Sequence, residues 1–210
     1  MPTEELVMLD CFCGMGGVSD GFALEGFNVT GIDIEDAPKK LGYKHSFYQA
    51  DLKEISVHVL KYEFPKVDVI WGSPPCRDFT KLPDHGEMKT GQHFKWKIPK
   101  DPQRGLRTVQ KFLKIVEYMQ PKIWILENVS GLADYLGLKP FAVDAKIWGG
   151  KRHVFYSNLK PFLIPTCKRT KVHEKYGGPL RSWERAKIPL SCSRAFAKAC
   201  KEELLEVCIG

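Results

Sequence analysis

Short, almost wholly apolar segments alternate along this chain with segments in which apolar residues recur every three or four positions. The apolar segments 6–12, 67–71 and 122–129 are typical of strands buried on both faces of a sheet. Helical spacing follows in 18–27 and again in 105–119. Strands and helices in this order predict an α/β protein with a Rossmann-like, mostly parallel sheet and helices on both faces.

The remaining elements complete this pattern. We expect further strands at 28–34, 47–50, 141–147 and 153–159, a helix at 52–62 and a last helix opened by Pro189. Residues 77–104 follow neither period and contain several prolines and glycines, which predicts a functional loop or a disordered segment. The chain then divides into a core at 1–159, a short basic segment at 160–188 and a C-terminal helix at 189–210 that packs back on the core.

A glycine-rich turn links the first predicted strand to the first predicted helix. Gly14, Gly16 and Gly17 stand where a dinucleotide-binding fold brings its ligand close to the backbone and to a helix N-terminus. Asp33 lies at the end of the next strand, where an acid can hydrogen-bond ribose hydroxyls. Position 19 is Ser rather than the third Gly of a GxGxxG pattern. Together these features favour a nucleoside-bearing cofactor over a plain tight turn followed by a surface Asp.

Asp51 follows the third predicted strand and has two possible roles. Its carboxylate could accept a hydrogen bond from an adenine amino group, or it could cap the helix predicted at 52–62. The sequence leaves both roles open.

Cys76 follows the apolar segment 67–71 on a stiff backbone. Pro74 and Pro75 each fix their own φ and favour extended geometry in the preceding residue. A cysteine nucleophile needs such a mounting, because its sulfur must stay within reach of a substrate atom. The alternative is a proline-rich turn around a buried, inert cysteine.

Glu127 lies near the end of the apolar segment 122–129. A carboxylate there is costly to bury unless it has a partner or a catalytic task. The carboxyl ends of adjacent parallel strands open into one crevice, so Glu127 can face Cys76. A structural glutamate with satisfied hydrogen bonds is the alternative.

Positive charge is concentrated at the C-terminal end. Residues 151–210 hold 13 Lys and Arg against 5 Asp and Glu, a net charge of +8, whereas the first 150 residues carry −1. This imbalance favours a surface that faces a polyanion over a solvated basic tail, because phosphate neutralisation drives most nucleic-acid affinity. The segment 77–104 adds basic residues interleaved with Phe79, Phe94 and Trp96. This combination suits phosphate contact and base stacking, and it favours a nucleic-acid-binding role for the segment over that of a passive polar loop.

Composition narrows the class and the location. A hydrophobic content of 43% with 27% charged residues is ordinary for a globular protein, and no apolar run reaches the roughly 20 residues of a membrane helix. The N-terminal residues lack the basic start of a signal peptide, so we expect a cytoplasmic protein, associated with the nucleoid if the source is prokaryotic or viral. We also expect a monomer. The seven cysteines are scattered without a CxxC pair, which predicts reduced thiols and no metal site.

Taken together, these motifs resemble the cytosine-C5 DNA methyltransferases over most of the chain and in the family's order. Residues 10–17 (Asp-Cys-Phe-Cys-Gly-Met-Gly-Gly) are similar to the family's cofactor motif, and residues 72–76 (Gly-Ser-Pro-Pro-Cys) to its nucleophile motif. Residues 127–129 (Glu-Asn-Val) are similar to its base-binding motif. Residues 188–189 and the last helix resemble the C-terminal motif more loosely.

The resemblance implies methyl transfer from S-adenosyl-L-methionine to C5 of cytosine in DNA, with S-adenosyl-L-homocysteine as product. It implies that Cys76 attacks C6 of a flipped-out base while Glu127 hydrogen-bonds N3. The cofactor would contact Phe12, Gly14, Gly16, Gly17, Asp33, Ile34, Asp51 and Pro74. We expect nucleic-acid contacts, to DNA rather than RNA, from Arg77, Lys81, Lys97, Lys151, Lys168, Arg169 and Arg181.

Two features depart from the family. Its next motif is Arg-x-Arg, whereas this chain has Lys151-Arg152-His153. In one register Lys151 and His153 take the arginine positions, and in another Arg152 takes one of them; we favour Arg152 as the cation near Cys76. The family's large target-recognition domain is reduced here to about 28 residues, 160–187, which predicts a short or weak sequence preference.

Readings from other classes remain open. A nicotinamide oxidoreductase would use the same glycine-rich turn, but it leaves the Pro-Pro-Cys and Glu-Asn-Val motifs without a task. A non-catalytic nucleic-acid-binding protein could keep the fold and lose activity through the altered arginine motif. Among methyltransferases, a tRNA cytosine-C5 enzyme is the second candidate.

Overall fold

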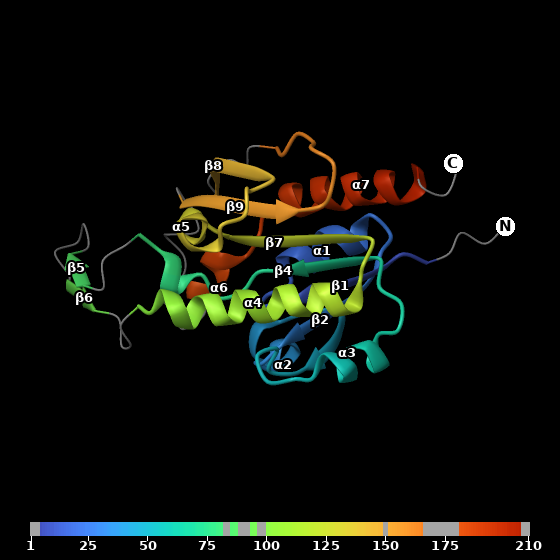
Figure 1. Cartoon of the computed structure of the whole chain (residues 1–210), viewed down its shortest axis with the longest axis horizontal. Coiled ribbons are helices and arrows are strands. Elements are labelled where there is room, and N and C mark those ends of the chain that lie inside the picture. The colour runs from blue at the N-terminus through green and yellow to red at the C-terminus, as the bar shows by residue number, and fades with distance from the viewer. Residues whose placement is uncertain are drawn as a thin grey trace.

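A computed structural model describes residues 5–81, 85–87, 93–95, 100–148, 151–165 and 181–206. Seven strands within these residues form one sheet (Figure 1). From one edge to the other they are β3 Ser46–Gln49, β2 Asn28–Asp33, β1 Val7–Cys11, β4 Val69–Gly72, β7 Ile123–Val129, β9 Lys151–Ser157 and β8 Ala142–Trp148. The first five in this order pair in parallel, and β9 pairs antiparallel with both β7 and β8. The predicted mostly parallel α/β sheet is confirmed.

Helices cover both faces of this sheet, as the apolar periodicity predicts (Figure 1). They are α1 Gly17–Leu24, α2 Ala37–Leu41, α3 Val57–Glu63, α4 Pro102–Met119, α5 Ala133–Leu136, α6 Arg181–Ala186 and α7 Leu190–Glu206. Helices α1 and α7 share one core cluster with the sheet, and α3 and α4 share a second. No helix within the described residues is long and apolar enough to cross a membrane.

Trp71 of β4 lies at the centre of the α1 and α7 face. Its fully buried ring packs edge-on against Phe22 of α1, Phe196 of α7 and Phe155 of β9, with ring centroids 6.3, 5.0 and 6.1 Å away. Such pairs add stability beyond the area they bury. The last helix, which begins directly after Pro189 as predicted, is thereby fastened to the central strand.

The α3 and α4 face is held by aliphatic and aromatic packing on the same strands. Ile70 of β4, Leu60 of α3 and Phe112 of α4 are fully buried in this second cluster. Phe112 lies so close to β4 that a Cβ at Gly72 would overlap its ring. The absence of a side chain at Gly72 therefore lets α4 approach the strand end that leads to Cys76.

The helix expected at 52–62 begins later than predicted. Asp51 accepts a hydrogen bond from the Lys53 backbone N–H at 2.9 Å and belongs to a turn, whereas Ser56 caps α3 by accepting from the His58 N–H at 3.2 Å. Of the two roles left open for Asp51, the helix cap is therefore excluded, and the adenine contact stays a prediction. Both residue types cap well, and the sequence alone does not show which one the chain uses.

The segment 77–104 holds more regular structure than its sequence predicts. A short 3-10 helix, η1 Arg77–Phe79, follows Cys76, and strands β5 His85–Glu87 and β6 His93–Lys95 form an antiparallel hairpin apart from the main sheet (Figure 1). Helix α4 begins at Pro102, and the Asp101 side chain caps it by accepting hydrogen bonds from the backbone N–H groups of Gln103 and Arg104. Three residues per element are too few to show a period.

Gly131 holds η1 against the end of β7. It lies in the 3-10 helix η2 Ser130–Leu132, and a Cβ at this position would overlap the backbone carbonyl oxygen of Phe79. Phe79 is three residues after Cys76, so this close approach fixes the height of the Cys76 turn above the sheet.

Gly131→Ala should push η1 away and lower the free energy of unfolding by about 1–3 kcal/mol, because the overlapped atom is backbone and cannot rotate aside. The alkylation rate of Cys76, followed by mass spectrometry of its peptide, should change with it. Gly137→Ala is the matched control, since that position opens to free space and costs about 1–2 kcal/mol only for its left-handed backbone. Equal Cys76 alkylation rates in both variants would contradict the role given to Gly131.

Candidate active site

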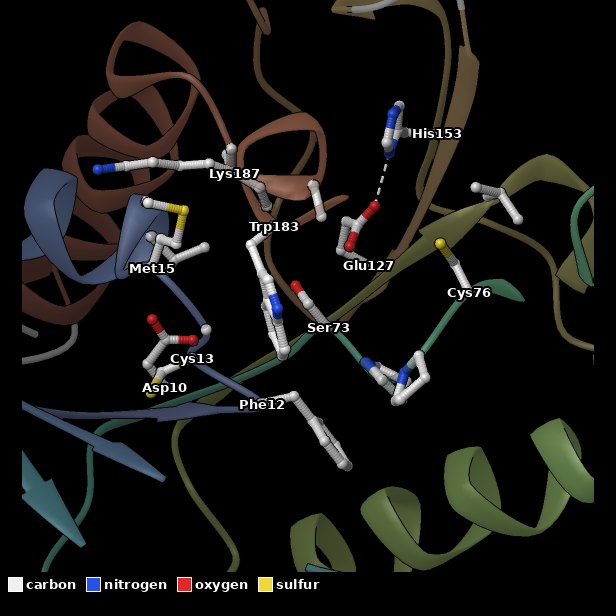
Figure 2. Close-up of a pocket in the computed structure, with 18 of the residues that line it drawn as sticks. Asp10, Phe12, Cys13, Met15, Ser73, Cys76, Glu127, His153, Trp183 and Lys187 are labelled. Atoms are coloured by element: carbon white, nitrogen blue, oxygen red, sulfur yellow. Dashed lines mark hydrogen bonds and ion pairs between the residues drawn. The ribbon is translucent and has the colours of Figure 1, made fainter. Parts of the chain in front are cut away.

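A cavity of about 410 Å³ opens at the carboxyl ends of β1, β4 and β7 (Figure 2). This volume is within the range of roughly 300–1,000 Å³ that small-molecule sites occupy. The walls come from the turns after these strands, from β9 and from residues 183–188. The lining includes Asp10, Phe12, Gly14, Gly17, Pro74, Cys76, Arg77, Glu127, His153, Trp183 and Lys187. Open parallel sheets bind their ligands in this crevice.

The glycine-rich turn after β1 forms one side of the cavity. Phe12, Gly14 and Gly16 all have left-handed backbones, with φ of 63°, 48° and 73°. Asp33 of β2 holds this turn, because its Oδ2 accepts a hydrogen bond from the Gly14 N–H at 3.0 Å. A Cβ at Gly17 would lie 2.6 Å from the carbonyl oxygen of Ile188, so the glycine lets the segment before α7 close over the turn.

The residues expected to contact a cofactor divide into two groups. Phe12, Gly14, Gly17 and Pro74 line the cavity, and Gly16, Asp33, Ile34 and Asp51 are not among its lining residues. Asp33 acts on the cavity through the Gly14 N–H, and burial raises the pKa of its carboxyl. Ile34 follows it with 54% of its surface exposed.

A chain of hydrogen bonds runs behind the turn. Ser19 donates to Asp10 Oδ2 through both its Oγ, at 2.6 Å, and its backbone N–H, at 3.2 Å. Ser19 Oγ in turn shares a hydrogen bond with the Tyr43 hydroxyl, 2.9 Å away. Burial raises the pKa of Asp10 to about 7, against the lowering effect of these Ser19 hydrogen bonds.

Cys76 stands where β4 leaves the sheet. Asn128 fixes the preceding turn, because its Nδ2 donates to the Pro74 carbonyl oxygen at 3.0 Å. The Cys76 side chain is half-buried and lines the cavity, whereas Cys11 and Cys13 are buried, and burial raises the pKa of both thiols. A nucleophile acts as its thiolate, so Cys76 is better suited to attack than either neighbour.

Glu127 faces the same cavity and is paired with His153. The carboxylate Oε1 lies 2.6 Å from His153 Nδ1, and the two residues are only 8% and 6% exposed (Figure 2). Cys76 and Glu127 therefore reach one cavity from adjacent parallel strands, as the sequence predicts. The partner of Glu127 is thus His153, one of the residues that stand at the position of the family's arginine motif.

The cation expected near Cys76 was Arg152, and this remains a prediction. Lys151 and Arg152 belong to β9, but their side chains lie outside the described residues. The strand register explains why His153 meets Glu127. Alternate residues of a strand share a face, and Phe155, two positions after His153, pairs with Glu127 in the β7–β9 register.

Comparison with known proteins identifies the family. A model of the C-5 cytosine-specific DNA methylases matches residues 6–137, which include both Cys76 and Glu127. This chain belongs to that family. A probable DNA (cytosine-5)-methyltransferase of Frog virus 3 (isolate Goorha) is 30% identical over 169 aligned residues. The match covers 76% of this methylase and 74% of the viral protein.

Other relatives share less of their length with this methylase. The type II methyltransferase M1.HphI of Haemophilus parahaemolyticus is 33% identical over 134 residues, which cover 60% of this chain but only 33% of the relative. Among solved structures, a putative DNA modification methyltransferase encoded within an Escherichia coli prophage has a TM-score of 0.51 at 21% identity. The superposition covers 73% of this chain and 46% of the prophage protein, and it shows that the two share a fold.

The basic residues expected to contact nucleic acid are only partly described in this methylase. Arg77 lines the cavity, and the exposed Lys81 lies 3.4 Å from Asp134. Lys97, Lys168 and Arg169 fall outside the described residues, as do the side chains of Lys151 and Arg181. The interface predicted from these residues stays a prediction.

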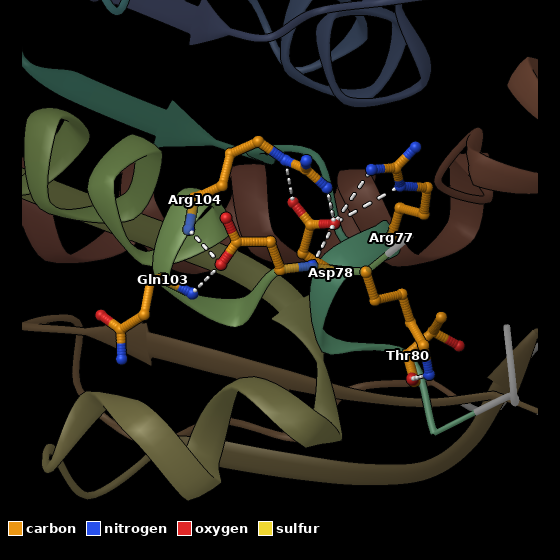
Figure 3. Close-up of polar contacts among 7 residues, drawn as sticks. Arg77, Asp78, Thr80, Gln103 and Arg104 are labelled. Atoms are coloured by element: carbon orange, nitrogen blue, oxygen red, sulfur yellow. Dashed lines mark hydrogen bonds and ion pairs between the residues drawn. The ribbon is translucent and has the colours of Figure 1, made fainter. Parts of the chain in front are cut away.

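Asp78 connects the turn after Cys76 to helix α4 (Figure 3). Its carboxylate accepts two hydrogen bonds from Arg104, from Nε at 3.0 Å and from Nη2 at 2.6 Å, and others from Arg77 and from the Asp101 N–H. Although burial opposes it, hydrogen bonding to Arg104 holds the pKa of Asp78 below its usual value. The segment 77–104, here called the hairpin segment, is also tied together near its two ends, because Lys100 Nζ donates to the Thr80 carbonyl oxygen.

The segment before α7 contributes residues that the sequence reasoning missed. Trp183 projects into the cavity beside Gly14, where a Cβ on the glycine would lie 3.3 Å from its ring (Figure 2). Lys187 also lines the cavity and forms a 2.9 Å ion pair with Asp20 of α1. The basic composition of 160–188 predicts a charged surface, and Trp183 near its end is the sequence feature that could have indicated an apolar wall.

Asp10 should make the stability of this methylase depend on pH. Its pKa is raised from 3.8 to about 7, so the folded protein keeps a proton that the unfolded chain has lost. The unfolding free energy should therefore fall as pH rises from about 4 to 7, by about 1.4 kcal/mol per pH unit for this group. Asp10→Asn should lack this part of the slope in urea titrations, whereas the exposed Asp134→Asn should keep it. An unchanged slope in Asp10→Asn would refute the assignment.

Arg104→Ala should loosen the turn after Cys76, because it removes two charged hydrogen bonds to Asp78. We expect about 1–2 kcal/mol of lost stability and faster hydrogen–deuterium exchange in the peptide that spans residues 76–81. Arg107→Ala removes the same residue type from an exposed position of α4 and should change stability by less than about 0.5 kcal/mol. Exchange that stays at the wild-type rate in Arg104→Ala would show that the clamp does not hold this turn.

Proposed function

We propose that this methylase transfers a methyl group from S-adenosyl-L-methionine to C5 of cytosine in DNA. The observation that carries the proposal is the shared cavity, into which the half-buried Cys76 and the paired Glu127 both project beside a glycine-rich turn. A nicotinamide oxidoreductase would leave the Pro-Pro-Cys and Glu-Asn-Val motifs unexplained. The viral relative is named a probable DNA (cytosine-5)-methyltransferase, which agrees with the proposed reaction.

The residues present fit the cofactor. Phe12 and Gly14 adopt left-handed backbones that open the turn, Asp33 holds Gly14 from below, and Pro74 and Trp183 add apolar walls. Methionine and nucleoside groups both need apolar surface with a few polar partners, and the cavity volume of about 410 Å³ is adequate for a ligand of this size. When bound, the cofactor supplies an electrophilic methyl group.

The chain's own residues would make C5 reactive. Cys76 Sγ adds to C6 of the base, and the electron pair of the C5–C6 double bond moves toward C5 and N3. Glu127 hydrogen-bonds N3 and neutralises the negative charge that develops during the attack. After methylation, loss of the C5 proton allows the C6–S bond to break and releases Cys76. The base must first leave the duplex, at a cost of a few kcal/mol.

The DNA contacts would come from the hairpin segment after Cys76 and from the basic segment 160–188. These regions carry Arg77, Lys81, Lys97, Lys168, Arg169 and Arg181, and the adjoining β9 carries Lys151. With so short a segment in place of a recognition domain, we propose a short or weak sequence preference.

Covalent trapping tests this function most directly. Wild-type protein with S-adenosyl-L-methionine and duplex DNA containing 5-fluorocytosine should form an adduct that survives denaturing electrophoresis, because fluorine at C5 cannot leave as a proton. Cys76→Ala should form none, and Cys192→Ala, which removes a buried thiol of α7, should still form it. S-adenosyl-L-homocysteine should bind in calorimetry, and NAD should not.

Each alternative has its own result in the same set of assays. An adduct with 5-fluorocytosine tRNA but not with DNA would identify a tRNA enzyme. Binding of both S-adenosyl-L-homocysteine and DNA without adduct or labelled-methyl transfer would identify a non-catalytic binding protein. Either result would overturn the proposed function.

A further inference from the structure

His153 and Glu127 are brought together by the antiparallel pairing of β9 with β7. His153 lies opposite Val129, two positions beyond Glu127 on the same face of β7. This diagonal placement lets His153 Nδ1 approach Glu127 Oε1 to 2.6 Å. The contact thus follows from the strand register and does not depend on an exposed, freely rotating side chain.

Burial of this pair constrains its charge. The side chains of His153 and Glu127 are 8% and 11% exposed, so an isolated charge on either would be poorly solvated. The pair avoids this cost when it holds one proton more than imidazole with carboxylate, because its net charge is then zero. That proton can lie on the histidine, as imidazolium with carboxylate, or on the glutamate, as imidazole with carboxylic acid. Arginine in the same place would hold its charge permanently, because its guanidinium does not release a proton in proteins.

Other ionisable groups line the cavity that the pair faces: Asp10 after β1, Cys76 and Arg77 after β4, and Lys187 before α7. Asp144 of β8 pairs with His153 in the strand register, and its side chain lies outside the described residues. The Glu127 carboxyl group lies within hydrogen-bond distance of the ring, with Oε1 2.6 Å from His153 Nδ1.

We propose that His153 is a positioning residue that shares its proton with Glu127, so that the pair, rather than Glu127 alone, supplies the proton to N3 of cytosine. This inference rests on the proposed function. As the Cys76 S–C6 bond forms, the displaced electron pair reaches N3, and N3 takes the proton of the Glu127 carboxyl group. The His153 Nδ1–H then donates to the carboxylate left behind, and the pair carries one negative charge until the proton returns.

The sign of the pH dependence follows from this proton count. The pair is competent while it holds the extra proton and loses competence when it releases that proton to solvent. Single-turnover methyl transfer should therefore fall on the alkaline side, about tenfold per pH unit once the pair has titrated.

The test compares His153→Asn with His153→Leu in single-turnover methyl transfer across pH. Asn keeps an N–H donor near the place of Nδ1 but cannot hold a proton, and Leu removes the donor as well. We expect His153→Asn to lose about tenfold in rate at neutral pH and to move its alkaline limb to lower pH by at least about one unit. His153→Leu should lose more, with S-adenosyl-L-homocysteine affinity unchanged in both. A wild-type rate and pH profile in His153→Asn would overturn the proposal.

A second measurement needs no activity. The ring nitrogen NMR signals of His153 should change over a lower pH range in Glu127→Gln than in the wild type, because the nearby carboxylate is lost. An unchanged range would overturn the shared proton even in an active methyltransferase. A shifted range in a protein that forms no adduct with DNA would leave the pair intact and refute only the proposed function.

Discussion

The register of the parallel strands is the constraint on which the rest of the site depends. Gly72 of β4 pairs with Leu126 of β7, so the two strands end side by side and deliver Cys76 and Glu127 to one crevice. At the opposite end of these strands the buried Asp68 accepts from the Val7 N–H at 2.9 Å and pairs with Lys122 at 3.0 Å. These contacts join β1, β4 and β7 and oppose a slip between them, which would separate the thiol from the carboxyl.

Buried acids around the cavity are tolerated because each has a donor of its own. Asp10 has the Ser19 hydroxyl and N–H, Asp33 has the Gly14 N–H, and Glu127 has His153. Two of these donors are backbone groups of the glycine-rich turn and of α1, so the carboxylates shape the turn while the turn stabilises the carboxylates. The polar groups around this cavity thus hold the glycine-rich turn in its conformation, and Glu127 is also placed to act on a substrate.

The turn that carries Cys76 is held from three directions. Asn128 binds the carbonyl oxygen of Pro74, Asp78 ties the turn to Arg104 of α4, and Gly131 admits the Phe79 backbone over the end of β7. The hairpin strands β5 and β6 extend from this anchored base. A nucleophile held firmly at the root of a projecting segment suits a reaction in which the substrate must be enclosed while the sulfur stays in place.

The sequence by itself determined the fold class, the Cys76 turn and the pairing of Cys76 with Glu127 at one crevice. Apolar strands, glycine positions and prolines act locally, and a parallel sheet brings the ends of its strands to one edge by geometry alone. Tertiary structure decided which neighbour Glu127 would have and what would cover the turn. His153 meets Glu127 through the β7–β9 register, and Trp183 reaches Gly14 from about 170 residues away in the chain. Contacts of this kind depend on how distant segments pack, and no local pattern of residues encodes them.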